Sequence, residues 1–263
     1  MKYFLIISGD ERSNDVRDWV DTWNKTVKRD DSPEIEFIYD PDYDDFDGVV
    51  VVGGDGKMLN AISDYNHKEK PFFGINRGTF GFLLNPIDSF YDFLEALKNF
   101  NQHKILELNL LNATFFGEAD SAAGVEYAFN DVYVKAKEGN ETIAGDVISY
   151  SSEKHFQKPF KGDGLIVATP QGSTAYNHSA GGYVLPLEEK LLAVTSICSM
   201  NEPIKEVTTI DKVDIVIRRG TAIGYADRKK IENVKKIVIT PAHTVKLVFV
   251  KSYNYQLKRF QLK

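Results

Sequence analysis

The sequence predicts two architectures in succession: an α/β domain built on a parallel sheet, then a β-rich, β-sandwich-like domain. Strand-like and helix-like segments alternate up to about Asn99, which is typical of a parallel sheet covered on both faces. Strand-like segments then follow one another with little helix between them. The 263 residues also exceed the roughly 100–200 residues of a typical domain, so two domains of modest size are expected.

The elements of the first domain follow from local apolar patterns. Continuous apolar runs predict strands buried on both faces, and apolar residues three or four positions apart predict helices. Strands are predicted at Tyr3–Ile7, Ile35–Tyr39, Gly48–Val52 and Phe72–Ile75. Helices are predicted after an N-cap at Ser13 as far as Val27, over Met58–Ile62 and over Phe90–Leu97.

The second domain is predicted to be built mainly of strands. Helix is expected only between about Thr174 and Leu192. Strands are predicted at Lys104–Leu111, Ala113–Phe116, Val125–Val134, Glu141–Ser149, Leu165–Ala168, Lys212–Arg218, Ala222–Asp227, Lys235–Ile239 and Val245–Val250.

Composition excludes several classes of protein. The formal net charge of −6 argues against a general nucleic-acid binder, which usually carries a basic surplus. The lone Cys198 allows no disulfide within the chain and indicates a reducing compartment. The apolar run Tyr3–Ile7 is too short for a signal peptide, and no stretch approaches the ~20 apolar residues of a membrane span. A cytoplasmic protein without membrane or nucleic-acid partners is expected.

The strongest local signal is the run Gly53-Gly54-Asp55-Gly56 directly after the strand Val49–Val52. Open parallel sheets bind ligands beyond the carboxyl ends of their strands. Glycines let the backbone approach a phosphate closely, and a helix N-terminus adds positive potential. An aspartate here suits phosphoryl transfer if it handles Mg²⁺ or accepts a proton from an attacking hydroxyl. Alternatively, Asp55 only caps the following helix.

Two further segments have the composition of nucleotide-binding loops. Residues 74–81 (Gly-Ile-Asn-Arg-Gly-Thr-Phe-Gly) follow the next strand, and Arg77 offers a planar fork for phosphate, although an ordinary strand-to-helix connection explains them as well. Residues 162–182 include a loop dense in hydroxyl groups, which suit sugar hydroxyls, an amide or a base edge. These are Thr169, Ser173, Thr174, Tyr176 and Ser179.

Other chemistry-bearing patterns are absent from the sequence. The five histidines lie far apart without metal-ligand spacing, so no protein-held metal site is predicted. The sequence contains neither a P-loop nor a Gly-x-Gly-x-x-Gly fingerprint. Gly172-Ser173-Thr174 lacks the second glycine of a nucleophile elbow.

Taken in this order and spacing, the motifs resemble those of the NAD kinase family. The resemblance is carried by Gly53–Gly56 (GGDG), Gly74–Leu83 (GINRGTFGFL), the pair Asn130-Asp131, and Gly162–Gly182, which includes TPQGSTAY. The GGDG turn is shared with phosphofructokinases and diacylglycerol-type lipid kinases, whereas the TP-x-GSTAY block is specific to NAD kinases.

The resemblance implies phosphorylation of the 2′-hydroxyl of the NAD adenosine ribose by ATP, with Mg²⁺, in a homo-oligomer that is a dimer or a tetramer. It also implies an α/β nucleotide-binding domain over residues 1–99 and a β-rich NAD-binding domain over residues 100–241. A C-terminal segment, about residues 242–263, is expected to return to the first domain.

By position, Asp55 resembles the catalytic carboxylate, Asn130 an adenine contact, Asp131 a ribose contact, and Asp163 the carboxylate near the nicotinamide. The residues expected to bind NAD are Gly54, Asp55, Gly56, Asn130, Asp131, Asp163, Gln171, Thr174, Ala175, Tyr176, Ser179 and Asp227. The residues expected near the phosphates of ATP are Gly53, Gly54, Lys57, Arg77 and Gly78. Lys57 departs from the usual small residue and either reaches a phosphate or points to solvent, and Gln171 departs from the usual Thr or Ser.

Three other functions fit part of these observations. A GGDG-type lipid kinase would need an apolar pocket for an acyl chain, which the hydroxyl-rich loop does not suggest. A catalytically silent NAD or nucleotide sensor would keep the pocket, but the presence of Asp55 favours catalysis. A ligand-free α/β and β pair would not need the block over Gly162–Gly182.

Overall fold

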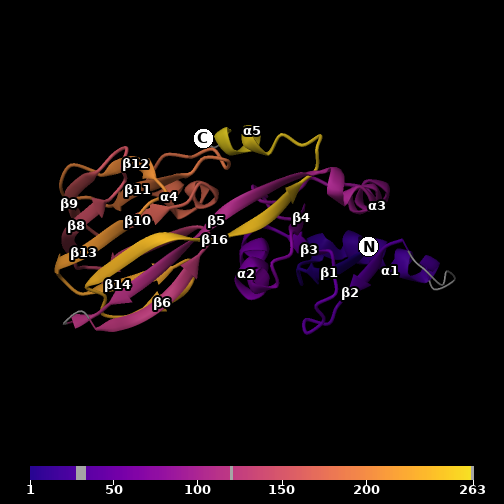
Figure 1. Ribbon diagram of the computed structural model, residues 1–263, viewed down its shortest axis with the longest axis horizontal. Helices are drawn as coiled ribbons and strands as arrows, with labels where there is room; N and C mark the ends of the chain where they lie inside the picture. The colour runs from indigo at the N-terminus through magenta and orange to yellow at the C-terminus, as the bar shows by residue number, and fades with distance from the viewer. Residues whose placement is uncertain (28–33, 119–120, 262–263) are drawn as a thin grey trace. The chain divides into compact units, whose positions relative to one another are not determined.

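The computed structural model describes residues 1–27, 34–118 and 121–261, and the chain divides into two compact units (Figure 1). Unit 1 comprises Met1–Leu108 and Val245–Gln261, and unit 2 comprises Asn109–Thr244. Of the C-terminal segment expected over residues 242–263, the last two residues lie outside the described part of the chain.

Unit 1 is built on a parallel sheet with the strand order β2-β1-β3-β4-β16, in which each strand runs parallel to its neighbours. The strands are β1 (Lys2–Ile7), β2 (Glu36–Ile38), β3 (Gly48–Gly53), β4 (Phe72–Asn76) and the last part of β16 (Lys236–Phe249). Every residue of β3 is buried, as its unbroken valine run predicts.

The helices of unit 1 present apolar stripes to this sheet. Val16 and Val20 of α1, and Phe93 and Leu97 of α3, belong to one hydrophobic core with the strand residues. The α-helices are α1 (Asn14–Val27), α2 (Asp55–Tyr65), α3 (Phe90–Lys98) and α5 (Tyr255–Phe260), and short 3-10 turns are η1 (Glu11–Ser13), η2 (Asn66–Lys68) and η3 (Phe100–Gln102).

Unit 2 contains antiparallel sheets. Its six-stranded sheet has the order β12-β11-β10-β7-β14-β15, with every neighbouring pair antiparallel. These strands are β7 (Asp131–Ala136), β10 (Gly164–Ala168), β11 (Leu191–Ile197), β12 (Lys205–Thr209), β14 (Ala222–Ala226) and β15 (Lys229–Ile231). The other strands are β5 (Lys104–Phe116), β6 (Ala122–Ala128), β8 (Ile143–Ser149), β9 (Phe156–Gly162), β13 (Val213–Arg219) and the first part of β16.

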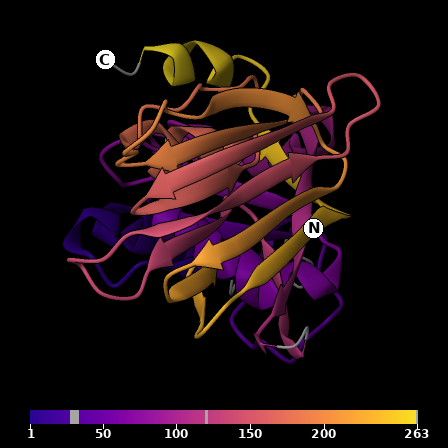
Figure 2. The same ribbon diagram turned by 90° about the vertical axis from the view of Figure 1, so that its left-hand side faces the viewer.

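The two groups of strands in unit 2 share one hydrophobic core. Val132 and Val167 from the six-stranded sheet pack in the same cluster as Val147, Ile215 and Phe115 from the other strands. Figure 2 turns the strands of this unit toward the reader. The predicted fold class, an α/β domain followed by a β-sandwich-like domain, is thereby confirmed.

The structure corrects several predicted elements. The predicted strand Val125–Val134 is two strands, because the chain turns between β6 and β7 at Asn130. The strands predicted at Lys104–Leu111 and Ala113–Phe116 are one continuous strand, β5. Those predicted at Lys235–Ile239 and Val245–Val250 are likewise one strand, β16. Within β16, Pro241 lies between the residues paired with β13 and those paired with β4, where its missing N–H breaks neither ladder. Ser13 is wrong as the N-cap of α1, since it ends η1, whose own cap is Asp10.

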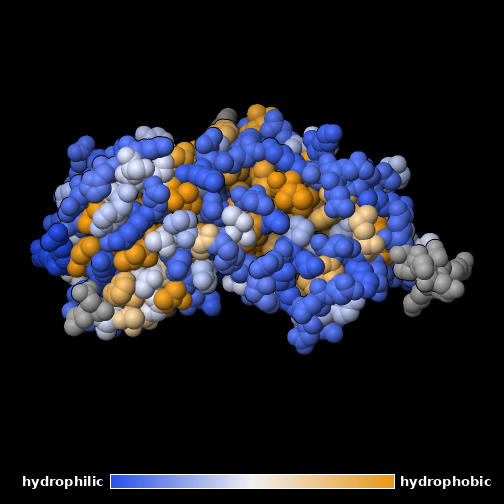
Figure 3. Space-filling view, in the orientation of Figure 1, coloured by the Kyte–Doolittle hydropathy of each residue, from blue (hydrophilic) through white to orange (hydrophobic). Residues whose placement is uncertain are grey.

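The helix predicted between Thr174 and Leu192 is much shorter than that range. It consists of a 3-10 turn, η5 (Gln171–Thr174), and α4 (Tyr176–Ser179). Within the described residues, no helix is long and apolar enough to cross a membrane. On the face drawn in Figure 3, hydrophobic side chains lie in patches within a largely hydrophilic surface.

Candidate active site

The two glycine-rich segments of unit 1 meet where β3 and β4 end. Because these strands are parallel and in register, Gly53 lies opposite Asn76. The Arg77 N–H donates to the Gly53 carbonyl at 2.7 Å. A Cβ atom at Gly78 would lie 2.6 Å from the Gly54 Cα atom, so only glycine allows this approach. The sequence therefore brings Gly53, Gly54 and Gly78 together at the carboxyl edge of the sheet, as expected for a parallel fold.

Asp55 begins α2, but its side chain does not cap that helix. The N-cap is Gly54, and no side chain caps the helix there. The Asp55 carboxylate instead accepts N–H bonds from Gly81 (3.0 Å) and Leu83 (2.9 Å). Gly81 has a φ of 66°, a left-handed conformation that glycine adopts without strain. The helix-cap interpretation of Asp55 is thus wrong, and the carboxylate is held between the first turn of α2 and the second glycine segment.

Two residues of the C-terminal segment lie within electrostatic reach of Asp55, and neither was expected from the sequence. Burial lowers the pKa of the Arg259 guanidinium to about 10, and the negative charge of Asp55 opposes that shift. Burial and the same negative charge raise the pKa of Tyr253. Arg259 is fully buried although it belongs to the short helix α5. Arg259 thus places a buried positive charge within electrostatic reach of the Asp55 carboxylate.

Arg77 is engaged inside unit 1. Its Nε and Nη2 atoms donate to the Asp15 carboxylate at 2.7 to 3.1 Å, and its guanidinium lies 5.3 Å from the Trp19 ring centroid. The planar fork that a phosphate would need is therefore held by Asp15. Binding of phosphate by Arg77 would require this pair to open.

In unit 2, Asp227 holds the backbone at the start of β7. Its carboxylate accepts N–H bonds from Phe129 (2.7 Å), Asn130 (2.8 Å) and Asp131 (3.2 Å). Asp227 itself has a φ of 50°, which an aspartate tolerates at a turn. The side chain of Asp227 is thus committed to shaping the Asn130–Asp131 turn.

Asp131 and Asn130 present unusual polar groups at this turn. Asp131 is 4% exposed, and burial, followed by the negative charge of Asp227, raises the pKa of Asp131 to about 8. Burial also raises the pKa of Asp227, but its three N–H bonds oppose that shift, so Asp131 holds the proton of the pair more firmly than Asp227. The Asn130 Oδ1 atom is buried and receives no hydrogen bond within the described part of the structure. An unmet acceptor beside a buried carboxyl group suits a ligand with donor groups.

Most polar groups of the loop over residues 169–182 are used inside the protein. Thr169 Oγ1 donates to the Phe129 or Asn130 carbonyl, and Gln171 Nε2 donates to the Phe129 and Asn109 carbonyls. Ser173 Oγ donates to the Pro170 carbonyl. These bonds account for hydroxyl groups that the sequence assigned to a ligand, and the amide nitrogen of Gln171 is committed to two carbonyls rather than to adenine.

The loop leaves a smaller set of side chains accessible: Thr174, Ala175 and Tyr176, which are partly buried, and Ser179, which is exposed. Asp163 lies at the other end of the β7–β10 pair, since Gly164 is the register partner of Lys135 whereas Ala168 is the partner of Asp131. Four residues of strand separate these ends by about 13 Å. Asp163 and Asp131 therefore cannot contact the same half of a dinucleotide.

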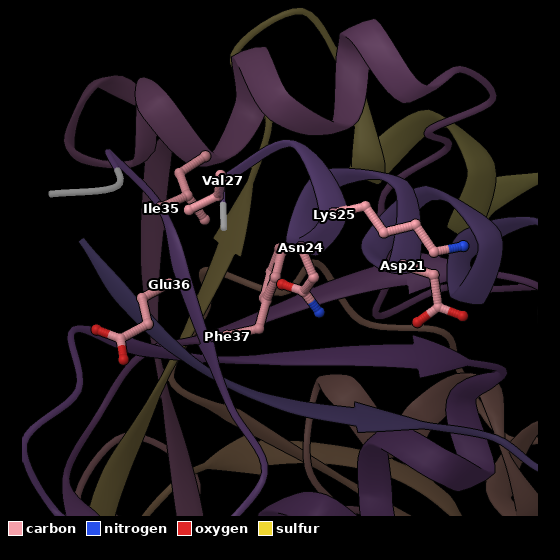
Figure 4. A pocket seen from close by; sticks show the side chains of 7 residues that line it. All are labelled: Asp21, Asn24, Lys25, Val27, Ile35, Glu36 and Phe37. Atoms are coloured by element: carbon pink, nitrogen blue, oxygen red, sulfur yellow. The ribbon is translucent and has the colours of Figure 1, made fainter. Parts of the chain in front are cut away.

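No group of three or more His, Cys, Asp or Glu side chains able to hold a metal occurs among the described residues. A separate hollow of about 560 Å³ in unit 1 is lined by Asp21, Asn24, Lys25, Val27, Ile35, Glu36 and Phe37 (Figure 4). In that view the carboxylates of Asp21 and Glu36 lie on opposite sides of the hollow. Because these two carboxylates do not point toward a common point, they could not act together on one ligand. The glycine segments therefore remain the better candidate for the active site.

Comparisons with known proteins identify a family for both units. The family model of the ATP-NAD kinase N-terminal domain matches residues 11–105, and that of the C-terminal domain matches residues 129–227. NAD kinase from Rickettsia bellii is 32% identical over 225 residues, which cover 82% of this chain and 84% of that protein. NAD kinase from Rickettsia typhi is 30% identical, with 81% of this chain and 84% of that protein covered.

Two solved structures share the fold. Yeast NADH kinase complexed with NADH superposes with a TM-score of 0.78 at 18% identity, covering 99% of this chain and 86% of the yeast chain. An NAD kinase from Archaeoglobus fulgidus in complex with ATP gives a TM-score of 0.73 at 22% identity, with both chains fully covered.

Proposed function

The chain belongs to the ATP-NAD kinase family, and from this premise we propose how it transfers the γ-phosphate of ATP to the 2′-hydroxyl of the adenosine ribose of NAD. The protein is a phosphotransferase whose product is NADP. Phosphoryl transfer asks for little covalent chemistry from the protein, so positioning and charge compensation carry most of the catalysis.

Asp55 is the proposed catalytic residue. A ribose hydroxyl is a poor nucleophile at neutral pH, and a carboxylate within hydrogen-bond reach assists removal of its proton. The observation that carries this assignment is the placement of the carboxylate at the start of α2, where Gly81 and Leu83 N–H groups hold it beside the glycine turn. The N-terminus of α2 and the nearby Arg259 guanidinium add positive potential beside this carboxylate.

The phosphates of ATP are proposed to lie along the glycine segments. Backbone N–H groups around Gly53, Gly54 and Gly78 can approach phosphate oxygens closely, with Lys57 adding positive charge. Two anionic nucleotides must meet in a chain of formal net charge −6, so we propose that Mg²⁺ enters with ATP. The ion would offset part of the triphosphate charge.

NAD is proposed to bind through its adenosine half at the start of β7. The Asn130 Oδ1 atom, which lacks a donor within the described residues, can accept from the adenine amino group. Asp131 can bond the ribose hydroxyls, and Tyr176, with its neighbours Thr174, Ala175 and Ser179, can cover the base. Asp163, at the far end of the strand pair, is the proposed contact near the nicotinamide. We further propose a homo-oligomer and a cytoplasmic location.

A coupled assay tests the function directly. The purified protein is supplied with NAD, ATP and Mg²⁺, and NADP is detected with an NADP-specific dehydrogenase. NADP should form only when all three are present. Parallel reactions with NADH as acceptor and with polyphosphate as donor define the substrate range, and absence of NADP under every condition would refute the proposal.

A further inference from the structure

Three tyrosines of unit 2 form an aromatic cluster on one face of the six-stranded sheet. Tyr133 of β7 and Tyr225 of β14 are register partners, and their rings stack with centroids 4.5 Å apart and an interplanar angle of 9°. The ring of Tyr176 meets Tyr133 nearly edge-on, at 5.1 Å and 81°. Stacked and edge-to-face arrangements are the favoured geometries of aromatic pairs.

The cluster shares its face of β7 with residues of the proposed NAD site. Side chains alternate along a strand, so Asp131, Tyr133 and Lys135 lie on one face, while Val132 and Val134 enter the core from the other. Tyr133 therefore lies midway between the two ends of β7. Asp131 lies at one end, and Lys135 lies at the other, which is the end near Asp163. A dinucleotide extending between those ends would pass over this part of the sheet.

Tyr133 and Tyr176 pack at the margin of a buried hydrophobic cluster that includes Ile166, so the rings have both a packed side and an exposed side. Tyr133, Tyr176 and Tyr225 are each only partly buried, whereas the valines on the opposite face of β7 are completely buried. Burial, followed by the negative charge of Asp131, raises the pKa of Tyr133 to about 12, which is consistent with a ring close to that carboxyl group. The cluster thus borders the polar groups that NAD would contact.

The orientation of the Tyr176 ring depends on tertiary contacts. Its helix, α4, has only four residues, too few to be stable alone. Tyr133 meets the ring on one side, and the Lys135 Nζ atom lies 5.9 Å from its centroid. Because Tyr225 stacks on Tyr133, the contact between Tyr133 and Tyr176 is itself supported.

We propose that Tyr133 is a positioning residue for NAD. Tyr133 fixes the ring of Tyr176 in the orientation that covers the adenosine half of NAD, and Tyr225 supports Tyr133. This inference rests on the proposed function, since it assigns a role within the same NAD site. A ring held before binding loses less rotamer freedom when the ligand arrives, which strengthens binding without a new contact.

The test measures NAD and ATP binding separately by titration calorimetry. Tyr133→Leu, which removes the ring contact, should weaken NAD binding about three- to tenfold, the range expected for loss of an aromatic pair. Tyr133→Phe keeps the ring and should bind NAD normally. ATP binding should not change in either variant. If Tyr133→Leu does not fold, Tyr225→Leu removes the support alone and should weaken NAD binding in the same direction.

A double-mutant cycle shows whether Tyr133 acts through Tyr176. The variant with both Tyr133→Leu and Tyr176→Ala should bind NAD no more weakly than Tyr176→Ala alone. The matched control is Tyr127→Leu on β6, a half-exposed tyrosine whose ring also makes an edge-on contact, with His243 at 5.4 Å. That control should leave NAD binding unchanged.

Three results would each overturn the proposal. The losses of NAD affinity could add up in the double variant, a folded Tyr133→Leu protein could bind NAD normally, or it could lose ATP affinity as much as NAD affinity. Failure of the wild-type protein to form NADP would instead refute the proposed function. The two failures are therefore distinguishable.

Discussion

Neighbouring polar side chains in the candidate site of unit 2 have different roles. The Asp227 carboxylate accepts hydrogen bonds from three backbone N–H groups, whereas the neighbouring Asp131 is buried and has a raised pKa. Sequence patterns identify both aspartates but cannot separate these roles. Likewise, the hydroxyl groups of Thr169 and Ser173 bond carbonyls inside the loop, because a hydroxyl group satisfies a backbone group as readily as a ligand.

The raised pKa of Asp131 predicts a pH dependence of stability. The unfolded carboxyl group titrates near its ordinary value of 3.8, whereas the folded group titrates at about 8. Between these values the folded state holds a proton that the unfolded state has released, so the free energy of unfolding falls as pH rises from about 4 to about 8. Urea unfolding at pH 5 and pH 8 measures the decrease.

Asp131→Asn is the matched control for that experiment, because asparagine keeps the shape of the side chain and cannot titrate. The decrease in unfolding free energy between pH 5 and pH 8 should be smaller in this variant than in the wild type. An identical pH profile in both proteins would show that Asp131 is not the group responsible.

At the scale of elements, contact between the two glycine segments shapes the edge of unit 1 that we propose binds the phosphates of ATP. Gly78→Ala would place a Cβ atom 2.6 Å from the Gly54 Cα atom, so the segments must separate. Overpacking of this kind costs about 1–3 kcal/mol of unfolding free energy, and the apparent affinity for ATP should fall with it. Denaturant unfolding and ATP titration measure the two effects.

Gly139→Ala is the control, because a Cβ atom at Gly139 meets nothing within 4 Å. It should change the unfolding free energy by less than about 0.5 kcal/mol. If both alanine variants behaved alike, close approach of the two glycine segments would have no bearing on ATP binding.

Sequence patterns predicted the buried strand β3 well, but they missed three strands at sheet edges and also the inner strand β11, which is buried along almost its whole length. The valine run of β3 is unambiguous, whereas β9, β12 and β15 were not predicted. Each of these three ends a strand order, and β9 contains Pro159 together with lysines. Prolines and charges are tolerated where one side of a strand has no ladder partner, so edge strands lack the apolar signal on which prediction depends.

The candidate site shows the same contrast between local and long-range information. The glycine segments and the Asn130–Asp131 pair were predicted because each is contiguous in sequence. Arg259 was missed because only the fold brings it near Asp55. Tyr133 and Tyr225 were missed because only the fold sets Tyr133 against Tyr176 and stacks Tyr225 on Tyr133. The pairing of Arg77 with Asp15 was missed for the same reason, since 62 residues separate them in the chain.

At the scale of the whole molecule, an acidic chain must bind two anionic nucleotides. The formal net charge is −6, so local features must supply the positive potential. In unit 1 these are the backbone N–H groups of the glycine segments and the N-terminus of α2, and each of these acts over short distances. Within this arrangement, we propose that the negative charge of Asp55 serves catalysis rather than ATP binding.

The central claim is that the Asp55 carboxylate acts in phosphoryl transfer, and the kcat of Asp55→Asn for NADP formation tests it most directly. Asparagine removes the charge and keeps one of the two acceptors for the Gly81 and Leu83 N–H groups. General-base assistance is typically worth about 10²–10⁴-fold, so kcat should fall by that factor while NAD binding changes little. Asp64→Asn, the same change at an exposed position of α2, should leave kcat unaltered. A folded Asp55→Asn protein with near-normal kcat would contradict the claim.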